Sequence, residues 1–496
     1  MADVKREIER KYEAADGGLP ELAGAGGVAH VLDRGVVELD AVYYDTADER
    51  LGAASLTLRR RTGGADAGWH LKFPVAPGVR DEIRAPLSDT LPEEIAALVR
   101  ARVRGAELVP VVRLRSARDV RHLVGADGAL LAEASVDTVD AERLNRAGGT
   151  ARWTEIEVEL ADGADPAVLD AVEERLAEAG VRPSKAPSKV AEALRRTGGS
   201  RARPAGRAAE PVTAGDHVLA YLREQREAIL ARDPGVRRDL PDSVHQMRVA
   251  TRRLRSAFKS FGPVLDREAT APVAAELKWL ARELGAGRDQ EVLAERLSDA
   301  LDALPPGEVT GPVRERLASW ATARHGSTRG RLLGVLDSAR YLALLDSLDT
   351  LLADPPLRRK AARKPGKVLT RALHKEGDEL ARLVTAALDL PPGEDRDHAL
   401  HQARKRAKRA RYAAEAAVPA LGGPARAAKK LTSLLGEHQD SVLARQTLRE
   451  LAAVAHAAGE SAFTYGVLHE REERAARRTE RKLPGAWAKA RPAFPR

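Results

Sequence analysis

Two segments of this chain nearly repeat each other and carry basic side chains at helical spacing. They span residues 245–255 and 401–411. Because residues three or four apart lie on one face of a helix, each segment forms a cationic stripe. The stripes consist of His245, Arg248, Arg252, Arg255 and Lys259 in the first copy and of His401, Arg404, Lys405, Lys408 and Arg411 in the second. Neither stripe contains an acidic residue, so each is suited to a long, flexible polyanion.

A second shared element follows each stripe: Leu-Gly-Ala-Gly-Arg-Asp at 284–289 and Leu-Gly-Glu-His-Gln-Asp at 435–440. The repetition predicts that the C-terminal half is a duplicated helical unit. Lys278 and Lys429 occupy similar positions on the following helix and could extend the basic surface. We interpret Asp289 and Asp440 as residues that orient basic side chains or cap helices. An ordinary solvated helix face is the alternative, and the repetition in both copies disfavours it.

The first 195 residues carry charged side chains at every second position of several short segments. These rows are Glu7/Glu9/Lys11, Arg59/Arg61, His70/Lys72, Arg80/Glu82/Arg84, Arg113/Arg115 and Glu155/Glu157/Glu159. Residues two apart on a β-strand share a face, so each row marks one charged face. The opposite faces are often apolar, as at Ile8, Leu58 and Leu71. Either the charges face water above an apolar core, or the sheet closes and the charges line its lumen.

The distribution of charge along the chain also separates the first 195 residues from the remainder. Residues 1–195 have a net charge of −8 and the remainder a net charge of +17, which favours an anionic partner for the second part. Residues 197–211 are rich in helix and strand breakers and predict a linker. The absence of cysteine excludes disulfides and thiolate metal sites. Because the chain has no apolar leader and no apolar run of about 18 residues, we expect a soluble, cytoplasmic protein.

The ordered charged segments of the first part resemble the CYTH superfamily, the triphosphate tunnel metalloenzymes. Glu7-Ile-Glu-Arg-Lys11 matches the Glu-x-Glu-x-Lys signature of that family. The later matching elements are, in order, Tyr43-Tyr-Asp-Thr46, Leu58-Arg-Arg-Arg61, Trp69-His-Leu-Lys72, Arg80-Asp-Glu82, the Arg113/Arg115 pair, Asp137, Glu155-Ile-Glu157 and Ser188-Lys189. Val190 departs from the pattern, since many relatives have Tyr after the Ser-Lys pair. The resemblance implies an eight-stranded antiparallel barrel with flanking helices over residues 1–196, whose tunnel holds a triphosphate.

Carried over onto matching positions, the resemblance implies Mg²⁺ or Mn²⁺ as cofactor and divides the charged residues between metal and substrate. The implied metal ligands are Glu7, Glu9, Asp137, Glu155 and Glu157. The residues implied to bind phosphate oxygens are Lys11, Arg59, Arg61, Lys72, Arg113, Arg115 and Lys189. Glu7, Glu9, Lys11 and Glu157 would carry catalysis. We expect Arg60 to point outward because its phase is wrong, and His70 to be a packing or rim residue.

Residues 212–490 resemble the CHAD family, which is named for conserved histidines in an α-helical domain, and both copies of the repeated motif carry the resemblance. That family is associated with binding of inorganic polyphosphate and forms two related helical bundles. The resemblance places the bundles at about 212–350 and 365–490, so the whole chain is expected to be a multidomain α+β protein. We expect His245 and His401 to hydrogen-bond phosphate or an acid rather than bind a metal.

The leading hypothesis is therefore metal-dependent hydrolysis of inorganic triphosphate or short-chain polyphosphate in the tunnel, with polyphosphate bound by the helical domain. One alternative is a non-catalytic protein that binds polyphosphate or is targeted to polyphosphate granules in the cytoplasm. Another is an adenylate cyclase or a different enzyme of nucleoside or thiamine triphosphates. Nucleic acid is disfavoured as a partner because only 3% of the residues are aromatic, which limits base stacking. No membrane partner is expected.

Overall fold

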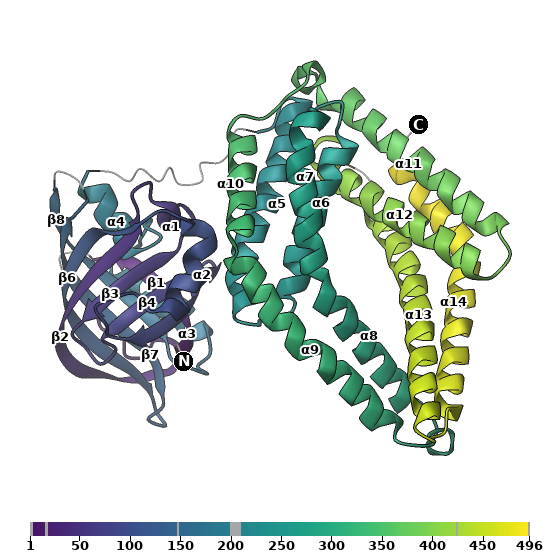
Figure 1. Cartoon of the computed structure of the whole chain (residues 1–496). Helices are drawn as coiled ribbons and strands as arrows, with labels where there is room; N and C mark the ends of the chain where they lie inside the picture. Colours follow the sequence, from purple (N-terminus) through teal and green to yellow (C-terminus); the bar gives the residue numbers. More distant parts are fainter. Residues whose placement is uncertain (1–2, 15–17, 146–147, 199–209, 423–424, 495–496) are drawn as a thin grey trace. The chain divides into compact units, whose positions relative to one another are not determined.

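The computed structural model describes residues 3–14, 18–145, 148–198, 210–422 and 425–494, without the side chains of residues 286–289, 291, 324–328 and 425. The chain divides into two compact units, residues 1–207 and 208–496 (Figure 1). Most of the linker predicted at 197–211 lies outside the described residues. Each unit is described by itself below.

Antiparallel strands dominate the first unit. They are β1 (Asp3–Glu13), β2 (Val28–Thr46), β3 (Thr57–Thr62), β4 (Gly68–Ala76), β5 (Val79–Pro86), β6 (Leu108–Gly125), β7 (Leu130–Arg143), β8 (Thr150–Leu160) and β9 (Arg182–Pro183). The strand order is β5-β4-β3-β2-β6-β7-β8-β1, and pairing of β1 with β5 closes the sheet into a ring of eight strands. The two-residue strand β9 pairs with Tyr12 and Glu13 at the C-terminal end of β1. The predicted eight-stranded antiparallel fold is thereby confirmed.

In the described part of this unit, short helices accompany the ring: the 3-10 helix η1 (Ala25–Gly27) and the α-helices α1 (Arg50–Ala53), α2 (Glu93–Val103), α3 (Ala167–Glu178) and α4 (Lys189–Arg196). The apolar residues that alternate with charge, such as Leu71 and Ile83, form an outer core with α2. Ile156 and Val158 do the same with α3. Burial of each such side chain stabilises the fold by about 2 kcal/mol. Helices thus cover the apolar outer faces, and the charged faces turn into the ring.

One end of the ring interior is apolar because helix α4 fills it. Leu194 of α4 joins a buried cluster with Leu114, Val139 and Trp153 of the surrounding strands. Ser188 caps α4, since its hydroxyl accepts a hydrogen bond from the backbone N–H of Ala191. The cap fixes the start of the helix, and Lys189 is therefore held at the boundary between the apolar plug and the charged lumen.

The second unit is helical. Its α-helices are α5 (Ala214–Arg237), α6 (Ser243–Ser260), α7 (Arg267–Glu283), α8 (Gly285–Asp302), α9 (Val313–Asp337), α10 (Ala339–Ala353), α11 (Pro365–Asp389), α12 (Glu394–Leu421), α13 (Ala425–Ala457) and α14 (Phe463–Ala490), with short 3-10 turns η2 (Pro306–Glu308), η3 (Arg359–Ala362) and η4 (Arg491–Ala493). The predicted all-α second part is confirmed.

The repeated sequence segments lie on equivalent helices, α6 and α12, which pack against each other. The second shared element lies at the junction of α7 and α8 in the first copy and inside the single long helix α13 in the second. Arg253 of α6 donates hydrogen bonds to Glu415 of α12 at 2.9 and 3.1 Å, which links the two copies. Farther along the unit, α8 and α9 pack on α13 and α14 through a core that includes Leu297, Leu448 and Leu468.

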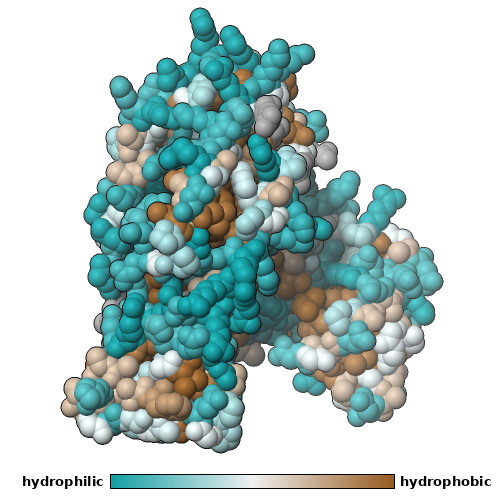
Figure 2. All heavy atoms as spheres, turned by 90° about the vertical axis from the view of Figure 1, so that its right-hand side faces the viewer, coloured by the Kyte–Doolittle hydropathy of each residue, from teal (hydrophilic) through white to brown (hydrophobic). Residues whose placement is uncertain are grey.

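Figure 2 shows hydrophilic side chains over most of the face that it draws, with hydrophobic residues gathered in smaller patches between them. Among the described helices, none combines the length and the apolar character that crossing a membrane would require.

Candidate functional site

The register of the ring turns the charged rows of the sequence into one continuous lining. Lys11 of β1 lies opposite Glu157 of β8, Glu155 lies opposite Asp137 of β7, and Asp137 lies opposite Arg118 of β6. Of these residues, Lys11, Arg118 and Glu157 line a cavity of about 770 Å³. Its charged lining consists of Lys5, Glu7, Glu9, Lys11, Arg34, Arg59, Arg61, Asp66, Lys72, Arg80, Arg84, Arg118, Glu133, Glu157, Glu159, Asp162 and Lys189.

Three buried carboxylates, Asp137, Glu155 and Glu157, have oxygens within 4.8 Å of one another. The ammonium of Lys189 lies 2.5 Å from Asp137, 3.1 Å from Glu155 and 2.5 Å from Glu157. Arg118 binds Asp137 and Glu157 at 2.7 Å each. Burial alone would raise the pKa of Glu157, but Lys11, Lys189 and Arg118 hold that pKa well below its usual range. Glu157 therefore stays ionised, and it is the member of the cluster that lines the cavity.

This cluster fits a hard divalent cation, because it offers three close carboxylate oxygens and no soft ligand. Of the five acids predicted as metal ligands, the structure brings Asp137, Glu155 and Glu157 together in it. Glu9 lies nearby, since Lys11 Nζ is 3.5 Å from Glu9 and also contacts Glu157.

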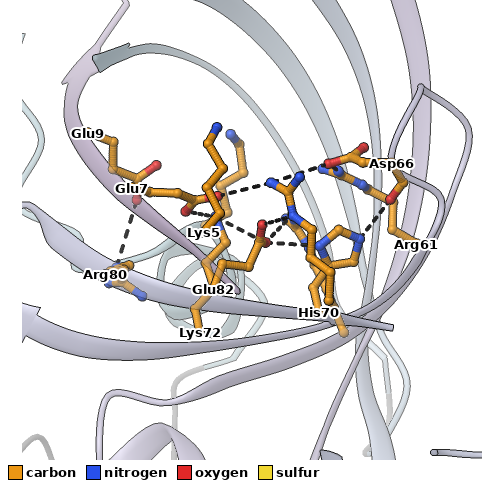
Figure 3. Close-up of polar contacts among 12 residues, drawn as sticks. Lys5, Glu7, Glu9, Arg61, Asp66, His70, Lys72, Arg80 and Glu82 are labelled. Atoms are coloured by element: carbon orange, nitrogen blue, oxygen red, sulfur yellow. Dashed lines mark hydrogen bonds and ion pairs between the residues drawn. The ribbon is translucent and has the colours of Figure 1, made fainter. Parts of the chain in front are cut away.

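Glu7 belongs to a second group of charges formed by β1, β4 and β5 (Figure 3). Lys72 and Arg84 contact Glu7, and both also contact the buried Glu82. Burial raises the pKa of Glu7. His70 is buried, with Nδ1 2.9 Å from Glu82 and Nε2 2.8 Å from the carbonyl oxygen of Asp66. The imidazole thus supports Glu82 from behind the cavity lining, in line with the packing position predicted for it.

Arg59 and Arg61 of β3 bring positive charge into the cavity, where Arg59 lies 3.5 Å from Glu82 and Arg61 pairs with Asp66. Their Nε atoms are buried, and neither has a hydrogen-bond partner among the described residues. Burial, together with the positive charges of Arg59 and Arg118, lowers the pKa of Arg61 to about 9. Buried guanidinium groups that repel each other gain from an anion placed between them. The site is therefore preorganised for an oxyanion rather than for a neutral ligand.

The prediction that Arg113 and Arg115 line the tunnel is wrong. Arg113 pairs across the sheet with Val42 of β2 and binds Asp40, whereas Arg115 is about half exposed. Both side chains lie on the outer face of β6, and the residue that β6 contributes to the lumen is Arg118. The sequence could have indicated Arg118 through its position, because residues an even number apart on a strand, such as Leu114, Arg118 and His122, share one face. Arg60 contacts the backbone oxygen of Ser88 on the outer side, as its phase predicted.

We expect replacement of Arg118 by alanine to raise the KM for an anionic phosphate substrate about 10- to 100-fold, because charge-assisted hydrogen bonds contribute about 1.5–3 kcal/mol each. Replacement of Arg113 by alanine should change KM by less than about twofold, since its partly exposed ion pair contributes little. Steady-state kinetics of the two variants measure the difference. Equal losses in both variants would show that the outer face of β6 takes part in binding.

The two cationic stripes of the second unit meet in a cleft between α6 and α12. Arg252, Arg255 and Lys259 of α6 and Lys405 and Lys408 of α12 line a cavity of about 410 Å³. Burial, together with the charges of Arg404, Arg252 and Arg248, lowers the pKa of Lys408 to about 7. Burial also lowers the pKa of Arg252 and Arg255. Like charges are therefore held together at a cost to the folded state, as in a preformed anion site.

Glycine in the second shared element makes room for the first stripe. A Cβ on Gly285 would lie only 3.1 Å from the guanidinium of Arg248, whereas one on Gly436 would fit, at 4.0 Å from Nε of Arg404. The remaining predicted residues sit beside the cleft rather than in its lining. His401 hydrogen-bonds Gln439, Arg404 lies 3.7 Å from Asp440, Arg411 binds Glu415 at 3.2 Å, and His245 lies in the first turn of α6. Asp289 lies outside the described side chains.

Comparison with known proteins identifies the class. A CYTH domain model matches residues 5–193, and a CHAD domain model matches residues 220–449. Two uncharacterized proteins of Mycobacterium tuberculosis, MT2285 and Rv2226, are each 40% identical over 97% of this chain and 96% of their own length. The chain therefore belongs to the family in which a CYTH domain is followed by a CHAD domain, as its sequence predicted. CYTH domains are typically metal-dependent enzymes that process triphosphates.

Solved structures resemble the chain in part. PptA from Streptomyces chartreusis is 25% identical, matches 56% of this chain and 99% of its own, and has a TM-score of 0.48. The CHAD domain from the plant Ricinus communis is 21% identical, matches 58% of this chain and 93% of its own, and has a TM-score of 0.41.

Proposed function

We propose that the ring cavity hydrolyses inorganic triphosphate or short-chain polyphosphate in a metal-dependent reaction, and that the helical domain binds polyphosphate. The observation that carries the proposal is the cavity lining. It brings the cations Arg59 and Arg61 into the same cavity as Glu157, which belongs to the carboxylate cluster of Asp137, Glu155 and Glu157. A phosphate chain bridged by a divalent cation requires both kinds of charge.

In this proposal Arg59, Arg61, Lys72 and Arg118 donate hydrogen bonds to phosphate oxygens and orient the chain. Their present acidic partners, which include Glu82 and Asp137, offset repulsion among them when no phosphate is bound. Asp137, Glu155 and Glu157, with Glu7 and Glu9 on β1, would hold Mg²⁺ or Mn²⁺. The bound cation would supply Lewis-acid stabilisation of charge on the transferred phosphoryl group.

Lys11 and Lys189 connect these two functions. Each contacts Glu157, and Lys189 also contacts Asp137 and Glu155. Several carboxylates lie close to these two ammonium groups. Their negative charge raises the pKa of Lys11 and of Lys189, although burial acts in the opposite direction. Both groups stay charged at neutral pH and can bind phosphate oxygens beside the carboxylates.

The cleft between α6 and α12 would hold longer polyphosphate. A chain tethered there would have a raised effective concentration for the tunnel of the same molecule. Retention in cytoplasmic polyphosphate granules would follow from the same binding.

A phosphate-release assay on the full chain tests the proposal. Triphosphate and short polyphosphate should yield phosphate with Mg²⁺ or Mn²⁺ and none with a chelator. Binding of polyphosphate without metal-dependent release would instead establish the non-catalytic alternative.

The cavity lining supports a second candidate, an organic triphosphate. Val37, Leu39, Val120, Leu130 and Leu160 form an apolar part of the same lining, which could accommodate a nucleoside or thiamine group. Faster turnover of ATP or thiamine triphosphate than of inorganic triphosphate would favour this candidate. Release of cyclic AMP and pyrophosphate from ATP would identify a cyclase instead.

A further inference from the structure

A second basic groove of the helical domain lies next to the cleft and extends beyond the repeated segments. Its volume is about 1470 Å³, larger than that of the cleft. Helices α7 and α11 and the residues around η3 form much of its wall. Eleven Lys or Arg residues line it, against three acids.

The three acids do not neutralise this groove. Glu376 accepts from Ser260 and binds Arg406 and Arg409, Asp378 binds His374, and Glu379 binds Arg382. Within the parts of the chain that the structure describes, the other nine cations of the lining have no ion pair. They are Arg255, Lys259, Arg267, Lys278, Arg358, Arg359, Lys360, Arg371 and Lys375. So many unpaired cations on one concave wall create a strongly positive potential.

The backbone holds part of this wall in place. Leu357 forms an antiparallel bridge with the buried Leu265. The N–H of Arg358 donates to the carbonyl oxygen of Val264 at 2.8 Å, and the N–H of Asp266 donates to that of Pro356 at 2.9 Å. The connection between the two repeat copies is thus attached to the loop that joins α6 to α7. Arg358, Arg359 and Lys360 start from a fixed backbone, which lowers the entropy lost when they bind a ligand.

The groove and the cleft are continuous. Lys259 lines both, and Arg255 lines both as well as a third cavity of about 450 Å³ beside α7. Lys278 lines the groove and that third cavity. A flexible polyanion bound in the cleft can therefore extend into the groove without crossing an uncharged gap.

We propose that this groove binds a second stretch of the polyphosphate chain that occupies the cleft, so that the helical domain selects long chains over short ones. The inference rests on the proposed polyphosphate binding by this domain. Phe258 is the one aromatic residue among the groove lining, so the surface offers charge but little base stacking. The chemistry therefore matches polyphosphate better than single-stranded nucleic acid.

Titration of the full-length protein with long-chain polyphosphate, short-chain polyphosphate and single-stranded DNA, over a range of salt concentrations, tests this inference. In the variant R358A/R359A/K360A, affinity for the long chain should fall about 10-fold, with a shallower salt dependence, since each lost phosphate contact reduces counterion release. Affinity for the short chain should stay within about twofold, because the cleft is intact. A second variant, K278A/R371A, alters the parts of the wall formed by α7 and α11 and should give the same pattern.

The matched control is R474A/R477A/R478A, which removes three exposed arginines of α14. It should leave the affinity for long chains unchanged. Wild-type affinity for long chains in both groove variants, or an equal loss for short and long chains, would overturn the inference, as would tighter binding of DNA than of polyphosphate. Failure of the unmodified protein to bind any polyphosphate would refute the proposed function of the domain itself.

Discussion

Replacing Glu157 by glutamine should lower metal-dependent phosphate release from triphosphate by about 100-fold or more, because removal of one preorganised charged group from a transition-state site typically costs that much. Glu157 contacts Lys11, Lys189 and Arg118 and belongs to the three-carboxylate cluster. Glutamine keeps the shape but removes the charge that a divalent cation needs. Initial rates measured against metal concentration should show that both kcat and metal affinity fall.

Stability must be measured beside activity, since loss of one member of a buried ion network can cost about 3–5 kcal/mol. Circular dichroism and thermal unfolding of the variant would show whether the ring remains folded. Glu142→Gln is the matched control, because Glu142 is exposed on the neighbouring strand β7. Wild-type turnover by a folded Glu157→Gln protein would remove the cavity from consideration as the catalytic site.

The alternation of charged and apolar residues along the strands was sufficient to identify most of the residues that line the lumen. On β1, β3 and β8, apolar residues such as Leu58 and Ile156 alternate with charge and pack beneath the outer helices. Once the sheet closes, the opposite face must turn inward, so Glu7, Arg59 and Glu157 share a cavity. The sequence left two arrangements open, a solvated charged face or a charged lumen. Pairing of β1 with β5, a contact between distant segments, decides between them.

The same rule failed on β6 because its inward face is mixed. Leu114 points inward and packs with Leu194 of α4, whereas Arg118 points inward where the cavity is open. On β6 the apolar Leu114 therefore lies on the inner face of the sheet, whereas on β3 the apolar Leu58 lies on the outer face. Assigning that face requires knowing that α4 fills one end of the ring. No local pattern around Arg113 carries this information.

The cationic stripes could be found from the spacing of their residues, but the lowered pKa values of these residues could not. Sequence places Arg252 and Lys408 in separate copies, some 150 residues apart. Packing of α6 on α12 brings both into one cleft, where the charge of Arg252 helps to lower the pKa of Lys408. This proximity makes the cleft sensitive to pH as well as to salt.

Polyphosphate binding should accordingly be accompanied by proton uptake between about pH 7 and 10. Lys408 has a pKa of about 7 in the fold, against 10.5 for an ordinary lysine, so it is largely neutral at pH 8.5 when no anion is bound. A phosphate chain in the cleft favours the charged form and raises that pKa, so up to one proton should be taken up per chain and affinity should fall as pH rises through this window. Calorimetric titrations in buffers of different ionisation enthalpy measure the uptake, and Lys408→Met should abolish it, whereas the exposed Lys489→Met should not.

The same shift predicts a stability effect of opposite sign for the unliganded protein. A depressed lysine pKa means that the unfolded chain binds more protons than the fold, so stability should rise with pH from about 7 to 10.5 and be flat below that window. Lys408→Met should therefore stabilise the protein by about 2–4 kcal/mol below pH 7, with the gain vanishing near pH 10.5. Urea unfolding followed by helical circular dichroism at several pH values measures this gain. A destabilised Lys408→Met variant at pH 6 would contradict the account, because it would show that the repulsion in the cleft costs the fold nothing.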